Sequence, residues 1–190
     1  MNRVVFLLEE ASMRDLLNGL LPRLYPELNF LCLAHEGKSD LERSIPRKLR
    51  AWREPGVHFV ILRDNDGGDC VLLKQQLMQS CRAAGRPDTT VRIVCQELEA
   101  WYLGEPDALA DAFEKESLRR IGRKARFRDP DAVQQPSEAL RRLVPGFRKV
   151  SGAKAMAGLL TRERNNSKSF HVLLSRLDQL YAELEDGASG

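Results

Sequence analysis

Residues 57–66 have the sequence Val57-His58-Phe59-Val60-Ile61-Leu62-Arg63-Asp64-Asn65-Asp66. The first part is rich in apolar and β-branched residues, which is typical of a strand buried on both faces of a sheet. The last part places two carboxylates one residue apart directly after that strand, and two glycines follow them. Because ligands of open parallel sheets bind at the carboxyl ends of the strands, this stretch predicts an α/β fold with an acidic site at one sheet edge.

Similar apolar runs on either side of this strand indicate the rest of the sheet. They lie at residues 3–8, 29–34 and 90–95, and amphipathic stretches typical of helices lie between them, at about 12–24, 39–53 and 70–83. Pro46 is expected to interrupt the second of these helices or to open its second part. This alternation predicts a parallel four-stranded sheet flanked by helices, and the chain after Glu97 shows helical patterns alone.

The length and composition fit one soluble domain with a helical extension. The chain has 190 residues, of which 43% are hydrophobic and 30% are charged, and no apolar stretch approaches the roughly 20 residues of a membrane span. The apolar run near the start is too short for a signal peptide, and the four cysteines form no Cys-x-x-Cys pair. We therefore expect a cytoplasmic protein with an α/β core over residues 1–104 and a helical extension over 105–190.

Basic residues are concentrated in one segment of the expected extension. Residues 119–149 contain 10 lysines and arginines against 3 acidic residues, whereas residues 1–118 contain 15 basic and 19 acidic residues. Such a segment favours a polyanionic partner, and the alternative is an arginine-rich helical surface exposed to solvent. Residues 119–136 are expected to form a flexible linker or binding loop. The candidates for phosphate contacts are Lys38, Arg119, Arg120, Arg123, Lys124, Arg126 and Arg128, with Arg141, Arg142, Arg148 and Lys149 further along.

Carboxylates follow three of the four expected strands. The first strand ends in Glu9-Glu10, the third in Asp64-Asn65-Asp66 and, after the glycines, Asp69, and the fourth in Glu97-Leu98-Glu99. Close carboxylates repel one another and raise each other's pKa, and a hard divalent cation relieves that repulsion. Glu9, Asp64 and Asp66 are therefore predicted ligands of Mg²⁺ or Mn²⁺. Asp69 is a further candidate ligand, and the open alternative is that it caps the helix that begins at Cys70.

Three other motifs fit the same residues poorly. An EF-hand loop that starts at Asp64 would need a glutamate where Gln75 stands. A phosphate-binding P-loop that ends in Gly37-Lys38-Ser39 would place its first glycine at Cys32, inside an expected strand. A receiver-type phosphoacceptor would need a lysine after a later strand, where the fourth strand here is followed by Glu97.

An apolar strand that ends in glutamate, followed about fifty residues later by a strand that ends in Asp-x-Asp, resembles the Toprim domain of topoisomerases, primases and the overcoming-lysogenization-defect nucleases. Glu9 matches the Toprim glutamate, which acts as a general acid/base or metal ligand in that family. Asp64 and Asp66 match its magnesium-binding aspartates. Glu10 stands where most Toprim domains have glycine, a departure that keeps a non-catalytic role open.

The whole chain is similar to a narrower group, the Toprim-like domain-of-unknown-function family 4276. The resemblance rests on the ordered segments Leu8–Ser12, His35–Lys38, Arg63–Asp66, Glu97–Gly104, Lys149–Lys154 and Asn166–Phe170. It implies a magnesium-dependent nuclease that cleaves phosphodiesters in nucleic acid, DNA ahead of RNA, and that works with an ATPase in bacterial defence. A homodimer is also expected. The alternative is a non-catalytic subunit of an ATPase that binds a metal or a nucleotide.

The same resemblance suggests two more site residues. Glu97 or Glu99 would be a ligand of a second metal, and Glu97 is chosen because it lies nearer the strand end and residues two apart do not share a helix face. The alternative is that both acids are solvated beside apolar packing. Lys154 would stabilise charge on the reacting phosphate, and the alternative is an ordinary surface lysine.

Overall fold

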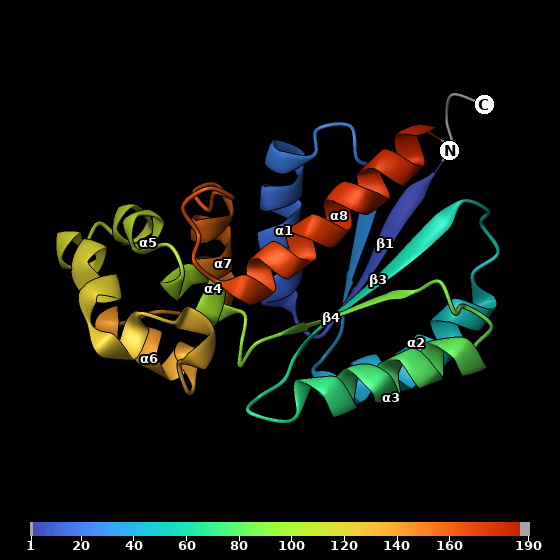
Figure 1. The fold of residues 1–190 in the computed structure, drawn as a ribbon, viewed down its shortest axis with the longest axis horizontal. Helices are drawn as coiled ribbons and strands as arrows, with labels where there is room; N and C mark the ends of the chain where they lie inside the picture. Colours follow the sequence, from blue (N-terminus) through green and yellow to red (C-terminus); the bar gives the residue numbers. More distant parts are fainter. Residues whose placement is uncertain (1, 187–190) are drawn as a thin grey trace.

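The strands form one parallel sheet in the computed structural model, which describes residues 2–186. They are β1 (Arg3–Leu8), β2 (Phe30–Ala34), β3 (Val57–Asp64) and β4 (Thr90–Val94). Their order across the sheet is β2-β1-β3-β4, and all three neighbouring pairs are parallel (Figure 1). The predicted four-stranded parallel α/β fold is therefore confirmed.

Helices cover both faces of the sheet (Figure 1). Helices α2 (Lys38–Ala51) and α3 (Cys70–Ala83) pack on one face, while α1 (Ala11–Leu24) and the C-terminal α8 (Lys168–Asp186) pack on the other. Successive residues of a strand point to opposite faces, so Val5 and Leu7 join the core under α2 and α3, and Phe6 joins the core under α1. This two-sided burial explains why the strands lack an alternation of polar and apolar residues.

Helix α2 runs through Pro46 without a break. Proline removes one backbone N–H bond from a helix, and that loss is offset here by buried side chains on both sides of it, Leu41, Ile45 and Leu49. The expected interruption of this helix is therefore wrong, because the tertiary packing of its apolar face outweighs the local effect of proline.

The chain after β4 contains helices alone among the described residues. These are α4 (Glu99–Leu103), α5 (Pro106–Ala112), the 3₁₀ segments η1 (Glu116–Arg123), η2 (Ala125–Phe127) and η3 (Pro130–Ala132), then α6 (Pro136–Leu143) and α7 (Lys149–Ala157). The basic segment is folded here, because Leu118, Ile121 and Phe127 are buried and hold it on the rest of the extension. It is a packed surface rather than a flexible linker.

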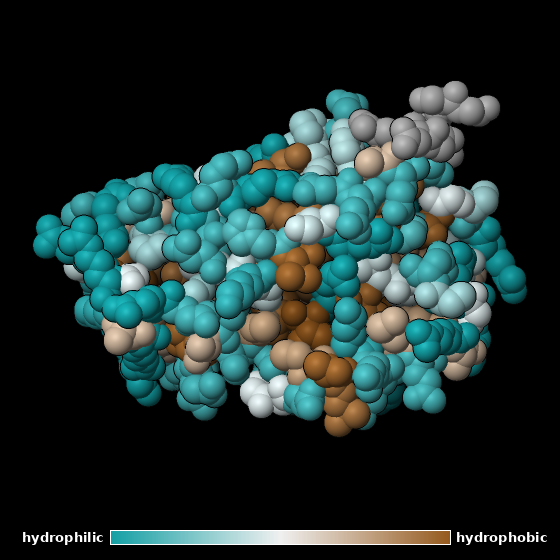
Figure 2. All heavy atoms as spheres, viewed as in Figure 1, coloured by the Kyte–Doolittle hydropathy of each residue, from teal (hydrophilic) through white to brown (hydrophobic). Residues whose placement is uncertain are grey.

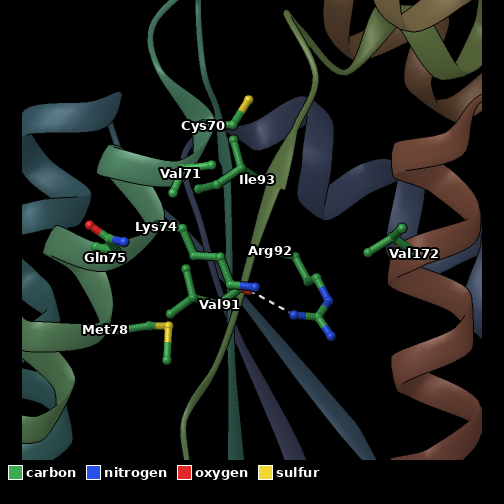
Figure 3. Close-up of a pocket in the computed structure, with 9 residues that line it drawn as sticks. All are labelled: Cys70, Val71, Lys74, Gln75, Met78, Val91, Arg92, Ile93 and Val172. Atoms are coloured by element: carbon green, nitrogen blue, oxygen red, sulfur yellow. Dashed lines mark hydrogen bonds between the residues drawn. The ribbon is translucent and has the colours of Figure 1, made fainter.

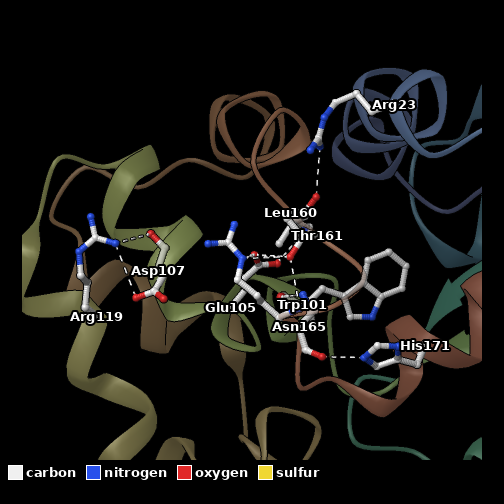
Figure 4. A network of polar contacts seen from close by, with 10 residues as sticks. Arg23, Trp101, Glu105, Asp107, Arg119, Leu160, Thr161, Asn165 and His171 are labelled. Atoms are coloured by element: carbon white, nitrogen blue, oxygen red, sulfur yellow. Dashed lines mark hydrogen bonds and ion pairs between the residues drawn. The ribbon is translucent and has the colours of Figure 1, made fainter. Parts of the chain in front are cut away.

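Polar contacts join the extension to the α/β core (Figure 4). Arg23 of α1 donates hydrogen bonds from its Nη1 to the carbonyls of Ala157 and Leu160, at 2.8 and 3.1 Å. The side-chain amide of Asn165 donates to the carbonyl of Trp101 at 2.9 Å. A single apolar cluster also runs from the sheet through α1 and α4 to α8, so the expected boundary between residues 104 and 105 does not separate two cores. None of the helices in residues 2–186 has the length and apolarity that crossing a bilayer requires.

Candidate metal centre

The candidate site lies between β1 and β3, where the connections of the sheet diverge. The chain leaves β1 through α1 toward β2, on one side, and leaves β3 through α3 toward β4, on the other side. Helices α1 and α3 cover opposite faces of the sheet. Ligands of doubly wound sheets bind at such a switch point, beyond the carboxyl ends of the strands. Glu9 directly follows β1 and Asp64 ends β3, so the fold places both predicted ligands there.

Glu9 and Asp64 are in direct contact. The Glu9 carboxylate accepts a hydrogen bond of 3.1 Å from the backbone N–H of Asp64, and Arg63 Nε lies 3.8 Å from the same oxygen. Burial and the nearby Asp66 raise the pKa of Glu9 above its usual value. Asp64 is 2% exposed, and burial, together with the charges of Glu9 and Glu99, raises the pKa of Asp64 well above its usual range.

A lysine faces a second group of acids beside this pair. Lys149 is the first residue of α7, and its Nζ lies 3.2 Å from a Glu10 oxygen and 3.9 Å from a Glu99 oxygen. Burial by itself would lower the pKa of Lys149, but Glu99 and Glu10 raise this pKa above its usual value. The hydroxyl of Ser12 also donates to Glu10. Lys149 therefore carries the positive charge that the neighbouring carboxylates require.

Several buried oxygens of this cluster have no hydrogen-bond partner among the described residues. They are Oδ1 of Asp64, both carboxylate oxygens of Glu99 and the hydroxyl of Tyr102. Glu99 is fully buried. Buried polar atoms are almost always hydrogen-bonded in folded proteins, so such exceptions point to a missing water or ion. Carboxylate oxygens are the ligands that Mg²⁺ and Mn²⁺ prefer, and these residues therefore fit a divalent cation in donor type and charge.

The acids are not gathered around a single point. Within residues 2–186, no group of three or more His, Cys, Asp and Glu side chains is arranged to hold a metal ion. Internal partners hold them apart instead: the Asp64 N–H holds Glu9, Lys149 holds Glu10, and Lys38 lies 3.4 Å from Asp66. A shared cation would require the exposed Asp66 to turn away from Lys38.

The buried Glu99 makes stability depend on pH in a defined direction. Burial raises the pKa of Glu99 from 4.5 to about 7, and Lys149 opposes this rise. The folded protein thus binds this proton more tightly than the unfolded chain, so the stabilisation is complete below pH 4.5 and is lost as the pH rises through about 7. We expect metal-free Glu99→Gln protein to be more stable than wild type at pH 8 by roughly 2–3 kcal/mol. Urea unfolding at pH 5 and pH 8 checks this, and a stability difference that does not change with pH would contradict it.

The turn after β3 is fixed to the end of β4. Asp66 and Gln96 both have positive φ, at 48° and 63°, a conformation that non-glycine residues adopt at a cost and that is frequent at functional sites. The N–H of Asp66 donates to the carbonyl of Gln96 at 3.0 Å, and the side chain of Asn65 accepts from the N–H of Gln96. These contacts hold Asp66 beside a polar cavity of about 250 Å³ that is lined by Asp66, Gly67, Gln96, Glu97, Gln134 and Gln135.

Two of the predicted ligands have structural partners. Oδ1 of Asp69 accepts hydrogen bonds from the first two N–H groups of α3 after Cys70, at 2.8 and 3.0 Å, so Asp69 caps this helix as its alternative described. Glu97 accepts a hydrogen bond of 2.7 Å from the N–H of Ser137 at the start of α6. Both carboxylates thus satisfy orphan N–H groups at helix starts, although the charge of Glu97 still acts on Glu99 and Lys149.

The charges of Glu99 and Lys149 act on Asp64, whereas Glu97 and Lys154 are the residues chosen from the sequence. Glu99 lies in α4, where every residue from Glu99 to Leu103 is buried. The alternative of a solvated Glu99 side chain is therefore wrong. Lys154 is exposed and lies 3.8 Å from Asp15, on the part of α7 away from the acids. The signal for Glu99 was an acid inside an otherwise apolar run, whereas nothing in the sequence separates Lys149 from Lys154 before the docking of α7 is known.

The predicted phosphate contacts differ in whether an acidic side chain already pairs with them. Arg119 is bound to Asp111 and to Glu116, and its ion pair with Asp107 is 3.6 Å long, so its charge is already neutralised (Figure 4 draws the Asp107 contact). The others in this segment are exposed and form no ion pair among the described residues; they are Arg120, Arg123, Lys124, Arg126 and Arg128. Lys38 lies at the acidic turn itself, beside Asp66.

A family model described as "Domain of unknown function (DUF4276)" matches residues 8–178. Among solved structures, the C-terminal region of the OLD protein from Burkholderia pseudomallei is 20% identical with a TM-score of 0.55, and the match covers 94% of this chain and 98% of that one. The C-terminal region of the OLD protein from Xanthomonas campestris pv. campestris is 16% identical with a TM-score of 0.57, covering 100% and 99%. At these identities the likeness concerns the fold. Curated proteins gave no match.

Proposed function

The chain belongs to the DUF4276 family, and we propose that it is a divalent-metal-dependent phosphodiester hydrolase that acts on nucleic acid. The observation that carries this proposal is the buried carboxylate of Asp64 at the switch point of the sheet, with an oxygen that lacks a hydrogen-bond partner. Glu9, Glu99 and the Lys149 ammonium surround it. An acidic cluster with a half-buried lysine is costly to a fold, and its position at the ligand-binding edge of the sheet supports a catalytic use.

The residues that would hold the cation follow from the contacts. Asp64 and Glu9 would form the fixed part of the site, since both are buried and in contact. Asp66 would complete it from the exposed turn, and the half-buried Glu10 would lie on the side next to Lys149. A bound Mg²⁺ or Mn²⁺ would neutralise these acids and polarise the phosphoryl oxygens of the substrate.

The chain's own groups account for the rest of the chemistry. Lys149 holds a full positive charge beside Glu10 and Glu99, and a cation at this place stabilises the negative charge that grows on a phosphate during attack by water. Glu99, with a pKa of about 7, can accept or donate a proton near neutral pH, as a general base or acid requires. Arg63, which lies 2.7 Å from Glu42, keeps Glu9 in position.

The basic segment supports a nucleic-acid substrate. Exposed cations bind phosphates through the release of counterions, so the affinity falls steeply with salt. We expect the double variant Arg123→Gln/Lys124→Gln to lower the slope of log affinity against log salt by about 2, at roughly 0.9 per lost contact. The Arg119→Gln variant should leave the slope nearly unchanged, because Arg119 is already paired. Fluorescence anisotropy with a labelled DNA duplex measures both, and equal slopes in all three proteins would contradict this interface.

The activity itself is tested with purified full-length protein and supercoiled plasmid. We expect nicking that requires Mg²⁺ or Mn²⁺ and stops on chelation, and parallel reactions with single-stranded DNA and RNA identify the preferred substrate. An inactive wild-type protein that still binds the metal would instead favour the non-catalytic subunit. The ATPase partner, the homodimer and a role in defence stay predictions.

A further inference from the structure

A groove runs along β4, between helices α3 and α8 (Figure 3). Its cavity volume is about 450 Å³, and it is separate from the acidic site. The residues that line it are Cys70, Val71, Lys74, Gln75, Met78, Val91, Arg92, Ile93 and Val172. In Figure 3 the side chains of Val71 and Met78 extend from α3, that of Val172 extends from α8, and the strand lies between them.

Strand β4 leaves one of its edges without a partner strand at the floor of this groove. It is the last strand of the sheet and pairs with β3 on one side. The carbonyl of Val94 accepts a hydrogen bond from Asn65, directly after β3. Since the backbone groups of successive residues point to opposite sides of a strand, those of Val91 and Ile93 point to the free edge. Such an edge is a template for another strand, which here would have to displace the hydrogen bond that the Arg92 side chain donates to the carbonyl of Val91 on that edge.

Apolar side chains border this edge. Val71 is 66% exposed and Val172 is 53% exposed, and both belong to the few large apolar side chains that the described residues leave exposed. Figure 2 shows a hydrophobic strip in the middle of this face, between α8 and α3. A strand edge that lacks a partner strand and lies between two apolar borders matches the way in which domains bind an extended peptide by β-strand addition.

The charge of the groove specifies the kind of peptide. Both charged residues that line it, Lys74 and Arg92, are basic. Nε of Arg92 is buried without a hydrogen-bond partner, and its Nη1 donates to the carbonyl of the preceding Val91 at 3.0 Å. Among residues 2–186, the neighbouring Arg176, whose charge also acts on Arg92, is paired with Glu183 at 3.1 Å, whereas Arg92 forms no ion pair. A guanidinium in this state lacks the carboxylate that it binds best.

We propose that this groove binds an extended acidic segment of another protein, which adds to β4 as a fifth strand and places a carboxylate on Arg92. The side chains of such a strand alternate in direction, so apolar residues would face Val71 and Met78 while acidic residues face Arg92. A second copy of this chain fits the groove poorly, because pairing two β4 edges would bring the Arg92 side chains of both copies together without a carboxylate.

The probe for this proposal is a fluorescent seven-residue peptide, Thr-Val-Glu-Val-Glu-Val-Thr, titrated into the full-length protein. We expect saturable binding, and we expect the amide signals of Val91 and Ile93 to shift in NMR spectra. Arg92→Gln should weaken the binding on the order of tenfold, and Val71→Asp should weaken it on the order of tenfold because it places a carboxylate beside the acidic strand. The matched controls are Arg82→Gln and Leu72→Asp, since Arg82 and Leu72 are exposed on α3 but do not line the groove.

Two altered peptides separate strand addition from nonspecific attraction. Lysine in place of both glutamates should abolish the binding, and proline in place of the central valine should do so by removing a backbone donor. The proposal is overturned if either altered peptide binds as well as the first, if the first does not saturate, or if the control variants weaken binding equally. It is also overturned if sedimentation shows a wild-type dimer that Val71→Asp dissociates, because a second copy would then occupy the groove.

Discussion

Asp64→Asn is expected to reduce metal-dependent cleavage of plasmid DNA by about a thousandfold. The amide has nearly the same shape as the carboxylate but no negative charge. It would therefore bind the cation less tightly, and the stabilisation of the reacting phosphate would fall by several kcal/mol. The metal-free variant should be at least as stable as wild type at pH 8, because Asp64 is a buried acid whose pKa is raised by burial and by Glu9. Nicking rates and urea unfolding of the same preparations measure both effects.

Asp69→Asn is the matched control for this variant. Asp69 is in the same acidic turn, but its carboxylate caps α3 by accepting hydrogen bonds from the N–H groups of Val71 and Leu72. Asparagine caps helices about as well as aspartate. Its cleavage rate should therefore stay within about twofold of wild type. If Asp69→Asn is as inactive as Asp64→Asn, Asp69 is a ligand after all, and if Asp64→Asn retains full activity, the proposed site is wrong.

Lys149→Met is expected to lose both activity and stability. Removing one partner of a buried ion pair leaves the other charge uncompensated, and here Glu10 and Glu99 would both lose their cation. Lys149 retains some exposure to solvent, so we expect a loss of about 1–3 kcal/mol in the free energy of unfolding at pH 8. The loss should shrink at pH 5, where Glu99, with its pKa of about 7, is protonated.

Lys154→Met distinguishes this effect from a general loss of charge on α7. Lys154 lies on the same helix but is exposed, and its contact with Asp15 is 3.8 Å long. An exposed ion pair contributes about 0–1 kcal/mol, so the variant should cleave and unfold like wild type. Equal losses in the two lysine variants would show that Lys149 has no special role.

The sheet could be predicted from the sequence because each strand has a strong local signal. The runs at residues 3–8 and 57–62 are apolar and β-branched, and the observed strands β1 and β3 cover them. The pair of Glu9 and Asp64 could be predicted as well, since residues that follow neighbouring parallel strands must lie at one edge. The continuous path of α2 through Pro46 could not be predicted from the sequence, because it depends on tertiary packing.

The remainder of the site depends on how the extension docks, which local patterns do not specify. Glu99 is brought to Asp64 by the burial of α4, and Lys149 by the packing of α7 against α1, where Gly19 closely approaches Ala157. The sequence shows that these residues are charged, but not which of two nearby candidates faces inward. This is why Glu97 and Lys154 were chosen, although the charges of Glu99 and Lys149 act on Asp64.

The most direct test of the metal centre is a crystal of the full-length protein soaked in Mn²⁺, with the ion located by its anomalous scattering. We expect a peak in bonding contact with Asp64 and Glu9, accompanied by a turn of Asp66 away from Lys38. A soaked crystal in which this position stays empty, or in which manganese binds only elsewhere, would contradict the account.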